Sequence, residues 1–180
     1  MKRTLSLLFL PVLLAFTLGG ITNWTVKPAG VKIDFSLPAE PHKLSFSGLD
    51  ASIAFDPADL AASEVIARID VKTLATEDPG LTQHLLSPDF LDAKKYPRIK
   101  LMSTGFEKQE GGGYLMHAAL AIKDSVHAVL VPFTFETKGE EGLFKGSFEI
   151  FSGDYGVMKK SKSGGDKVVI NLEIPVTRSK

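Results

Sequence analysis

Residues 114–135 read YLMHAALAIKDSVHAVLVPFTF, two runs of alternating side chains on either side of Asp124-Ser125. Alternation with a period of two is typical of a strand that buries one face. If Asp124 and Ser125 form a two-residue turn, the apolar side chains of one run meet those of the other on the same face. A slip of one residue would turn all of them to the opposite face. The stretch therefore predicts an antiparallel β-hairpin with the pairs Ile122–His127, Leu120–Val129, Ala118–Val131, Met116–Phe133 and Tyr114–Phe135.

The same alternation recurs along most of the chain beyond residue 22. It predicts further strands at 31–37, 44–47, 52–55, 65–71, 99–103, 143–151 and 168–176. Consecutive antiparallel strands with one apolar face must bury that face, either in a sandwich of two sheets or inside a closed barrel. We favour an all-β fold, an eight-stranded antiparallel β-barrel, because closure removes the exposed strand edges that promote aggregation. Such a barrel is just wide enough to be filled by side chains or to hold one small ligand.

The segment between residues 76 and 95 lacks this alternation. Its apolar side chains follow a helical spacing, whereas Pro79-Gly80 is typical of a turn. Ser87-Pro88 has the pattern of a helix N-cap followed by proline at the first helical position. We therefore expect one or two short helices within residues 79–95. They should end near Tyr96-Pro97, because the residue before a proline disfavours the helical conformation.

The first twenty residues have the three-part pattern of a secretory signal peptide. Lys2 and Arg3 precede an apolar run from residue 5 to residue 18, which is followed by Gly19 and Gly20. The run is shorter than the roughly 20 apolar residues that a membrane-spanning helix needs, although an uncleaved anchor is the alternative. We expect residues 1–20 to be removed near Gly19/Gly20. Residues 21–180 then form a single domain in the periplasm or outside the cell.

Charge and residue types exclude several classes of function. The 21 basic and 21 acidic residues give a net charge of zero, without the clustered cations of a nucleic-acid surface. The absence of cysteine excludes thiolate nucleophiles and cysteine-ligated metals. The four histidines lack the spacing of a metal site, and the hairpin places His117 outside the barrel and His127 inside it. The sequence thus implies no catalytic residue, no metal and no cofactor.

A long and specific motif lies between the two halves of the chain. Residues 83–99 read QHLLSPDFLDAKKYPRI, residues 53–57 before them read IAFDP, and residues 154–157 read DYGV. The stretch at 83–99 resembles the pattern H-L-x-S-x-D-F-F-D-x-x-K-Y-P-x-I of the YceI-like family, with Leu91 at one Phe position. Members of that family are exported polyisoprenoid-binding proteins with a lipocalin-like barrel. The resemblance covers roughly residues 22–178 and implies this fold and this class of ligand.

The inward positions of the predicted strands carry large apolar residues, with Gly48, Ala67 and Ala118 among them. Small residues among large ones either pack closely or leave a tunnel, and the pattern leaves both open. A polyprenyl chain has no polar group along most of its length, so apolar area and shape must recognise it. The expected ligand-binding residues are therefore those of the barrel wall: Ile33, Phe35, Phe46, Ile69, Leu101, Met116, Leu120, Val131, Phe133, Phe148 and Ile150.

These features together predict a function. We expect non-catalytic binding of an isoprenoid lipid, a prenyl quinone or polyprenyl carrier, for transport or storage in the cell envelope. One alternative is a structural or stress-related envelope protein with a filled core, and another is a lipid-modifying enzyme. The expected partners are the isoprenoid lipid and, transiently, a membrane, but no nucleic acid, and the protein is expected to be a monomer or a homodimer.

Overall fold

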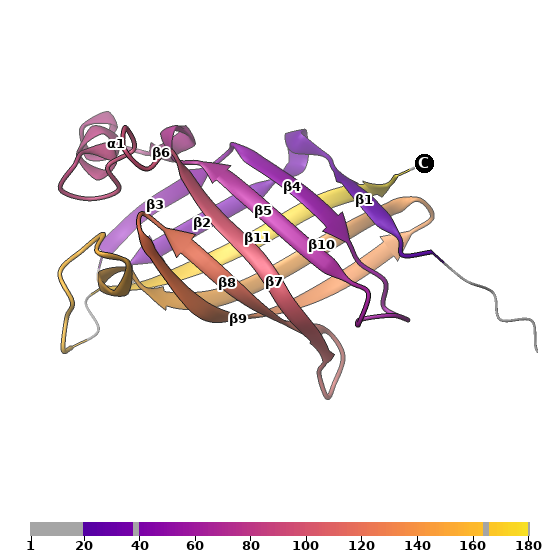
Figure 1. Cartoon of the computed structure of the whole chain (residues 1–180). Helices are drawn as coiled ribbons and strands as arrows, with labels where there is room; N and C mark the ends of the chain where they lie inside the picture. Colours follow the sequence, from indigo (N-terminus) through magenta and orange to yellow (C-terminus); the bar gives the residue numbers. More distant parts are fainter. Residues whose placement is uncertain (1–19, 38–39, 164–165, 180) are drawn as a thin grey trace, which may run out of the picture.

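The computed structural model describes residues 20–37, 40–163 and 166–179 (Figure 1). The predicted signal peptide therefore lies, apart from Gly20, outside the described residues. Among the described residues, no helix combines the length and the hydropathy needed to cross a bilayer.

The chain forms one antiparallel sheet that closes on itself (Figure 1). In the described residues, three 3-10 helices, η1 (Pro28–Gly30), η2 (Val71–Thr73) and η3 (Ser152–Tyr155), and one α-helix, α1 (Pro79–Leu86), lie between its strands. The strands are β1 (Asn23–Val26), β2 (Lys32–Leu37), β3 (Glu40–Phe46), β4 (Leu49–Ala54), β5 (Glu64–Asp70), β6 (Leu74–Thr76), β7 (Arg98–Lys108), β8 (Tyr114–Ile122), β9 (Ser125–Lys138), β10 (Glu141–Phe151) and β11 (Lys167–Arg178).

The eleven strands occupy eight positions around a barrel. The sheet order is β1-β4-β5-β7-β8-β9-β10-β11-β2-β3-β6, and β11 pairs with both β1 and β2. Hence β1 and β2 are two parts of one interrupted strand, and the same holds for β3 with β4 and for β5 with β6. The β1–β11 pairing closes the ring, which confirms the predicted eight-stranded antiparallel barrel rather than a sandwich.

The break between β3 and β4 has a local cause at Gly48. Its backbone N–H donates to Thr73 Oγ1 at 2.9 Å, so the chain lies directly against η2. A Cβ at Gly48 would come within 2.6 Å of the Thr73 methyl group, too close for any other residue. The small residue at this position thus permits a close approach of two chain segments and does not leave space in the barrel interior.

The predicted hairpin forms, but its turn is one residue earlier than expected. Lys123 and Asp124 make the turn, and Ile122 pairs with Ser125. Each predicted partner is therefore wrong by two positions: Met116, for example, lies opposite Val131. A shift of two leaves every side chain on its predicted face. Lys123 adopts a φ of 56°, a conformation that lysine rarely adopts and that its side-chain contacts, described below, help to hold.

Residues 79–95 contain one α-helix, which agrees with the predicted one or two. Its start and end differ from the predicted positions. Asp78 is the N-cap, since its Oδ1 accepts a hydrogen bond from Gly80 N at 2.7 Å, and Pro79 follows at the first helical position. The turn predicted at Pro79-Gly80 and the N-cap predicted at Ser87 are thus wrong. Ser87 instead ends the helix by donating its N–H to His84 O at 3.1 Å. Residues 88–95 form successive turns.

Candidate functional site

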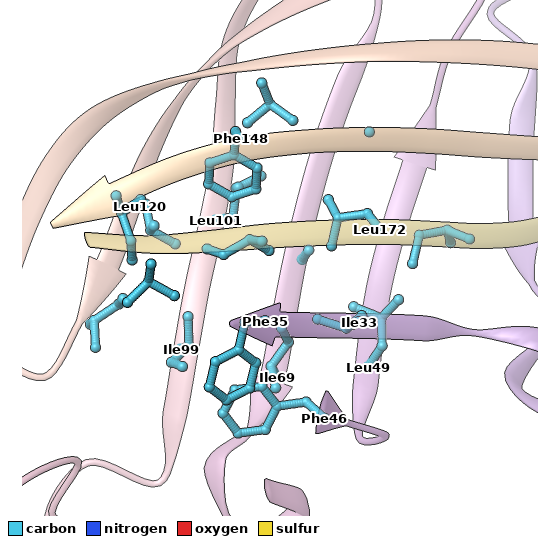
Figure 2. A pocket seen from close by; sticks show the side chains of 18 of the residues that line it. Ile33, Phe35, Phe46, Leu49, Ile69, Ile99, Leu101, Leu120, Phe148 and Leu172 are labelled. Atoms are coloured by element: carbon cyan, nitrogen blue, oxygen red, sulfur yellow. The ribbon is translucent and has the colours of Figure 1, made fainter. Parts of the chain in front are cut away.

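The barrel encloses an apolar cavity of about 250 Å³. This exceeds the roughly 150 Å³ at which an engineered apolar cavity stays dry and binds small apolar molecules. The structure therefore shows an apolar cavity and not a completely filled core. All eleven wall residues predicted from the sequence line it, and Figure 2 shows Ile33, Phe35, Ile69, Leu101 and Phe148 among them around a shared space. Whether they contact a ligand stays a prediction.

Several lining residues were missed by the sequence-based prediction. The period of two on β7 and β11 could have found Ile99, Ile170 and Leu172, which alternate with residues of the outer face. Ala51 and Ala67 also line the cavity and lie opposite each other on β4 and β5, so two small side chains coincide there. By contrast, the buried residue Ala118 does not line the cavity. The cavity therefore depends on which small residues lie opposite each other in the sheet.

One end of the cavity is closed by aromatic side chains that we call the floor. Phe55 has no exposed surface, and its ring centroid lies 5.1 to 5.6 Å from those of five other rings. Behind it, the indole N–H of Trp24 donates to Phe55 O at 2.9 Å. The floor consists of Trp24, Phe55, Phe106, Tyr114, Phe133, Phe135 and Phe144. Four of these seven residues line the cavity and the other three do not, so the floor is more than one ring thick.

The opposite end of the cavity, which we call the mouth, is lined by Leu85, Leu91, Val157 and Met158. All four are only half-buried, although they are apolar. They come from α1, the turns that follow it and the segment after η3, which lie at one end of the barrel in Figure 1. The mouth is therefore made of short segments, in contrast to the hydrogen-bonded wall.

The β8–β9 turn holds the two sides of the mouth together. The ammonium group of Lys123 donates to Phe90 O at 2.7 Å and to Gly156 O at 2.8 Å. These bonds join the turns after α1 to the end of η3. An ammonium donor makes stronger hydrogen bonds than a neutral one, worth about 1.5–3 kcal/mol each at buried sites and less where water competes. They also account for a lysine at a left-handed turn position.

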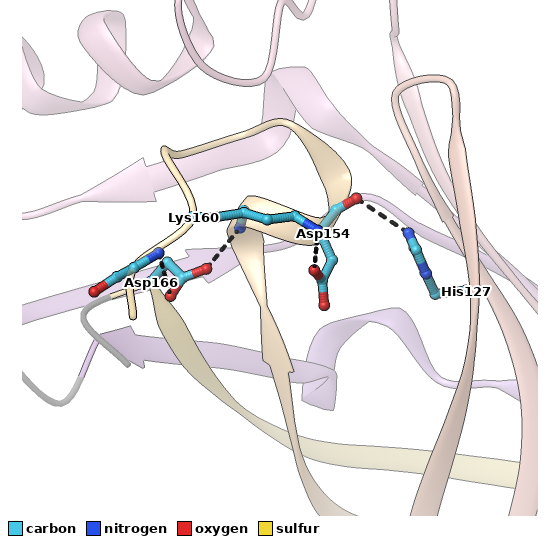
Figure 3. Close-up of polar contacts among 6 residues, drawn as sticks. His127, Asp154, Lys160 and Asp166 are labelled. Carbon is cyan, nitrogen blue, oxygen red and sulfur yellow. Dashed lines mark hydrogen bonds and ion pairs between the residues drawn. The ribbon is translucent and has the colours of Figure 1, made fainter. Parts of the chain in front are cut away.

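Polar contacts at the mouth lie around η3 and leave the cavity apolar (Figure 3). His127 Nε2 lies 3.0 Å from Asp154 O, at the end of the inward face of β9. The Lys160 ammonium, hydrogen-bonded to Asp154 at 2.9 Å, lowers the pKa of that carboxyl. Asp166 accepts hydrogen bonds from Gly153 N and Ser161 N, both at 3.2 Å, and so fixes the ends of this loop. These groups hold backbone in place and are engaged with one another.

Tyr155 gives the mouth a measurable pH dependence. Burial, with a smaller contribution from the Asp154 charge, raises the pKa of Tyr155 from 10.0 to about 12. Between these values the unfolded chain binds fewer protons than the folded one, so stability decreases as pH rises. Chemical denaturation of parent protein and Tyr155→Phe at several pH values between 9 and 12 measures this effect. We expect a steeper loss for the parent, whereas equal slopes would contradict the raised pKa.

The two histidines of the hairpin lie on opposite faces of the barrel wall. His117 lies on the outer face, as predicted, with its Nε2 2.9 Å from Glu107 Oε1. His127 belongs to the inward face but lies at the rim of the barrel. Its ring centroid is 4.9 Å from that of Tyr155. Within the part of the chain that the structure describes, no three His, Asp or Glu side chains gather as metal ligands would. The expectations of no metal and no catalytic residue stay predictions.

A family model and several curated proteins are similar to this chain in sequence. The model of the YceI-like domain matches residues 24–176. A UPF0312 protein of Vibrio cholerae is 23% identical over 134 residues, 71% of each chain, and one of Photorhabdus laumondii is 28% identical over 107 residues, 58% of this chain and 55% of the other.

Solved structures agree with the barrel. The crystal structure of BcnA from Burkholderia cenocepacia superposes with a TM-score of 0.77 at 26% identity and covers 85% of this chain and 100% of that one. A polyisoprenoid binding domain from Saccharophagus degradans, implicated in plant cell wall breakdown, gives 0.63 at 11% identity over 87% and 98% of the two chains. At that identity the second likeness concerns the fold alone.

Proposed function

The chain belongs to the YceI-like domain family, and on that premise we propose that it binds a long isoprenoid lipid inside its barrel without transforming it. The ligand class is a prenyl quinone or polyprenyl carrier, and the role is transport or storage in the cell envelope. The observation that carries this proposal is the continuous apolar cavity between mouth and floor. The polyisoprenoid binding domain with the same fold supports it.

Apolar area can supply the affinity. Each buried methylene contributes about 0.8 kcal/mol, so one five-carbon isoprene unit contributes about 4 kcal/mol when fully buried. Two to four such units can outweigh an association cost of roughly 4–15 kcal/mol. No charged partner is needed along the lipid chain, which suits a cavity whose described lining is almost entirely apolar; Lys145 is among the lining residues but is exposed on β10.

The two ends of the cavity orient such a ligand. Because aromatic rings close the floor and the polar contacts around η3 lie at the mouth, the hydrocarbon end lies against Phe55, Phe106 and Phe133 and the head group lies near η3. This arrangement leaves the head group in water, where it retains its hydration.

Mass spectrometry tests the proposal. We expect protein purified under non-denaturing conditions from its own cells to release one equivalent of a prenyl lipid on organic extraction. Protein stripped of lipid should rebind a fluorescent prenyl analogue. A clean extract together with no uptake by the stripped protein would contradict the proposal and favour a structural envelope protein.

Export is part of the proposal and has a separate test. The amino-terminal pattern at residues 1–20 supports delivery to the periplasm or the medium. Sequencing the amino terminus of the purified protein should show a start near residue 20 or 21. An intact Met1 would contradict cleavage and leave the binding proposal untouched.

A further inference from the structure

The large apolar side chains on the outside of the barrel are not scattered. Four are well exposed in the described part of the chain: Met102 at 51%, Val126 at 63%, Leu130 at 55% and Phe151 at 47%. They lie on β7, β9 and β10, and Met102, Leu130 and Phe151 each have a cavity-lining residue as a neighbour in the chain. Single exposed apolar residues are ordinary, whereas a contiguous patch marks a site of interaction.

The strand register makes these side chains neighbours. Met102 lies opposite Ala119 on β8, and Ala119 lies opposite Ala128 on β9. Val126 and Leu130 are two residues before and after Ala128 and share its outward face. On the other side of Met102 lies Ile66 of β5. We call this patch the apolar strip: Ile66, Met102, Ala119, Val126, Ala128 and Leu130.

The strip borders a part of the wall that lacks strand pairing. The β9–β10 ladder ends at Phe133 and Gly146, and no ladder pair joins residues 125–132 to residues 147–151, all of which the structure describes. Pro132 is the first β9 residue beyond the last pair, and proline has no N–H to donate to a ladder. Phe151, the fourth exposed apolar residue, lies across this seam on β10. The strip thus adjoins a section of the wall in which β9 and β10 are not paired.

Directly behind the seam lies the cavity. Val131 of β9 and Phe148 and Ile150 of β10 face inward there and line it. Outside, the strip has cations on the side of the mouth. Lys100 lies opposite Ala121, the neighbour of Val126, and has no acidic group within 4.0 Å in the described residues. Arg68 lies opposite Lys100 but is 3.7 Å from Asp50, so of these two described cations Lys100 is the one without an acidic partner.

We propose that the apolar strip is the surface with which this protein docks on a phospholipid bilayer. The inference rests on the proposed function, since a carrier that holds an isoprenoid must exchange it with a lipid phase. A bilayer fits better than a second copy of the chain, because the strip adjoins the cavity wall at the seam and is bordered by an unpaired cation. Exposed apolar side chains beside lysine suit the boundary between acyl chains and anionic head groups.

Vesicle flotation tests the proposal with a variant that introduces negative charge into the strip. Met102→Glu with Leu130→Glu places two carboxylates in the strip, whereas Thr104→Glu with Thr134→Glu places them on the outer faces of the same strands, outside it. With vesicles of phosphatidylethanolamine and phosphatidylglycerol, we expect the strip variant to float at least about tenfold less than the parent. The control variant should float like the parent. All three proteins should bind the prenyl analogue equally when it is delivered from solution without vesicles.

Each other outcome has a definite meaning. Equal flotation of parent and strip variant would overturn the docking surface, even if both bind the analogue. A parent that is dimeric by light scattering and a strip variant that is monomeric, with neither floating, would overturn it in favour of contact between copies. Loss of flotation in the strip variant alone, with no analogue bound by any of the three, would support docking and reject the proposed function.

Discussion

Ala67→Phe is expected to abolish most isoprenoid binding while the barrel still folds. Ala67 lines the cavity at a point where its neighbours across the sheet are Ala51 and Leu101. A phenyl ring there would occupy space equivalent to about one isoprene unit. Losing five buried carbons at about 0.8 kcal/mol each removes about 4 kcal/mol, nearly three orders of magnitude in affinity. Since the ligand can shift toward the mouth, we expect a loss of at least about 100-fold, measured by fluorescence titration with a prenyl analogue.

The matched control is the same exchange on the outer face. Ala121 of β8 lies outward, opposite Lys100 and Val126, so Ala121→Phe adds a ring without entering the cavity. Its affinity in solution should equal that of the parent. If Ala67→Phe also binds like the parent, the ligand does not occupy the cavity between β4 and β7, and the proposed binding mode is wrong.

Removing the central ring of the floor should cost much of the stability. Phe55 is fully buried among five aromatic rings, so Phe55→Ala leaves a void that these rings cannot fill without losing their contacts with one another. Such substitutions cost about 3–5 kcal/mol. Because a domain of this kind is stable by only about 5–15 kcal/mol, the midpoint of urea unfolding should fall markedly.

Phe151→Ala is the control for this prediction. It deletes the same ring from a position that is 47% exposed on β10, so its cost should be clearly smaller than that of Phe55→Ala. A comparable loss for both variants would mean that ring burial in the floor is not what stabilises this end of the barrel.

Much of the fold could be predicted because its cause is local. The period of two along residues 114–135 determines which side chains face inward, and the structure agrees on every face. The exact turn could not be predicted, because registers that differ by two residues bury the same side chains. The turn at Lys123-Asp124 is favoured by contacts distant in the sequence. The Lys123 ammonium donates hydrogen bonds to the carbonyl oxygens of Phe90 and Gly156, each 33 residues away.

The cavity itself could not be predicted, for a similar reason. The alternation of apolar and polar residues predicts which residues form the wall but not which of them are neighbours across the sheet. The cavity depends on Ala51 lying opposite Ala67. The floor likewise gathers residues from β1, β7, β8, β9 and β10 around Phe55, which follows β4. Each of these aromatic residues reads as an ordinary strand residue in its own segment. Only the closed ring brings them together.

The pairing of β1 with β11 determines where a fusion partner or a surface linker would lie relative to the barrel. Ser179 N donates to Asn23 O at 2.8 Å, so the start of β1 lies beside the end of β11, at the floor and away from the mouth (Figure 1). A fusion partner or a surface linker attached at either end therefore sits behind the aromatic rings and leaves the mouth unobstructed. The adjacent ends also suit circular permutation, with a short bridge from 179 to 23 and new termini in the glycine turn at 111–113.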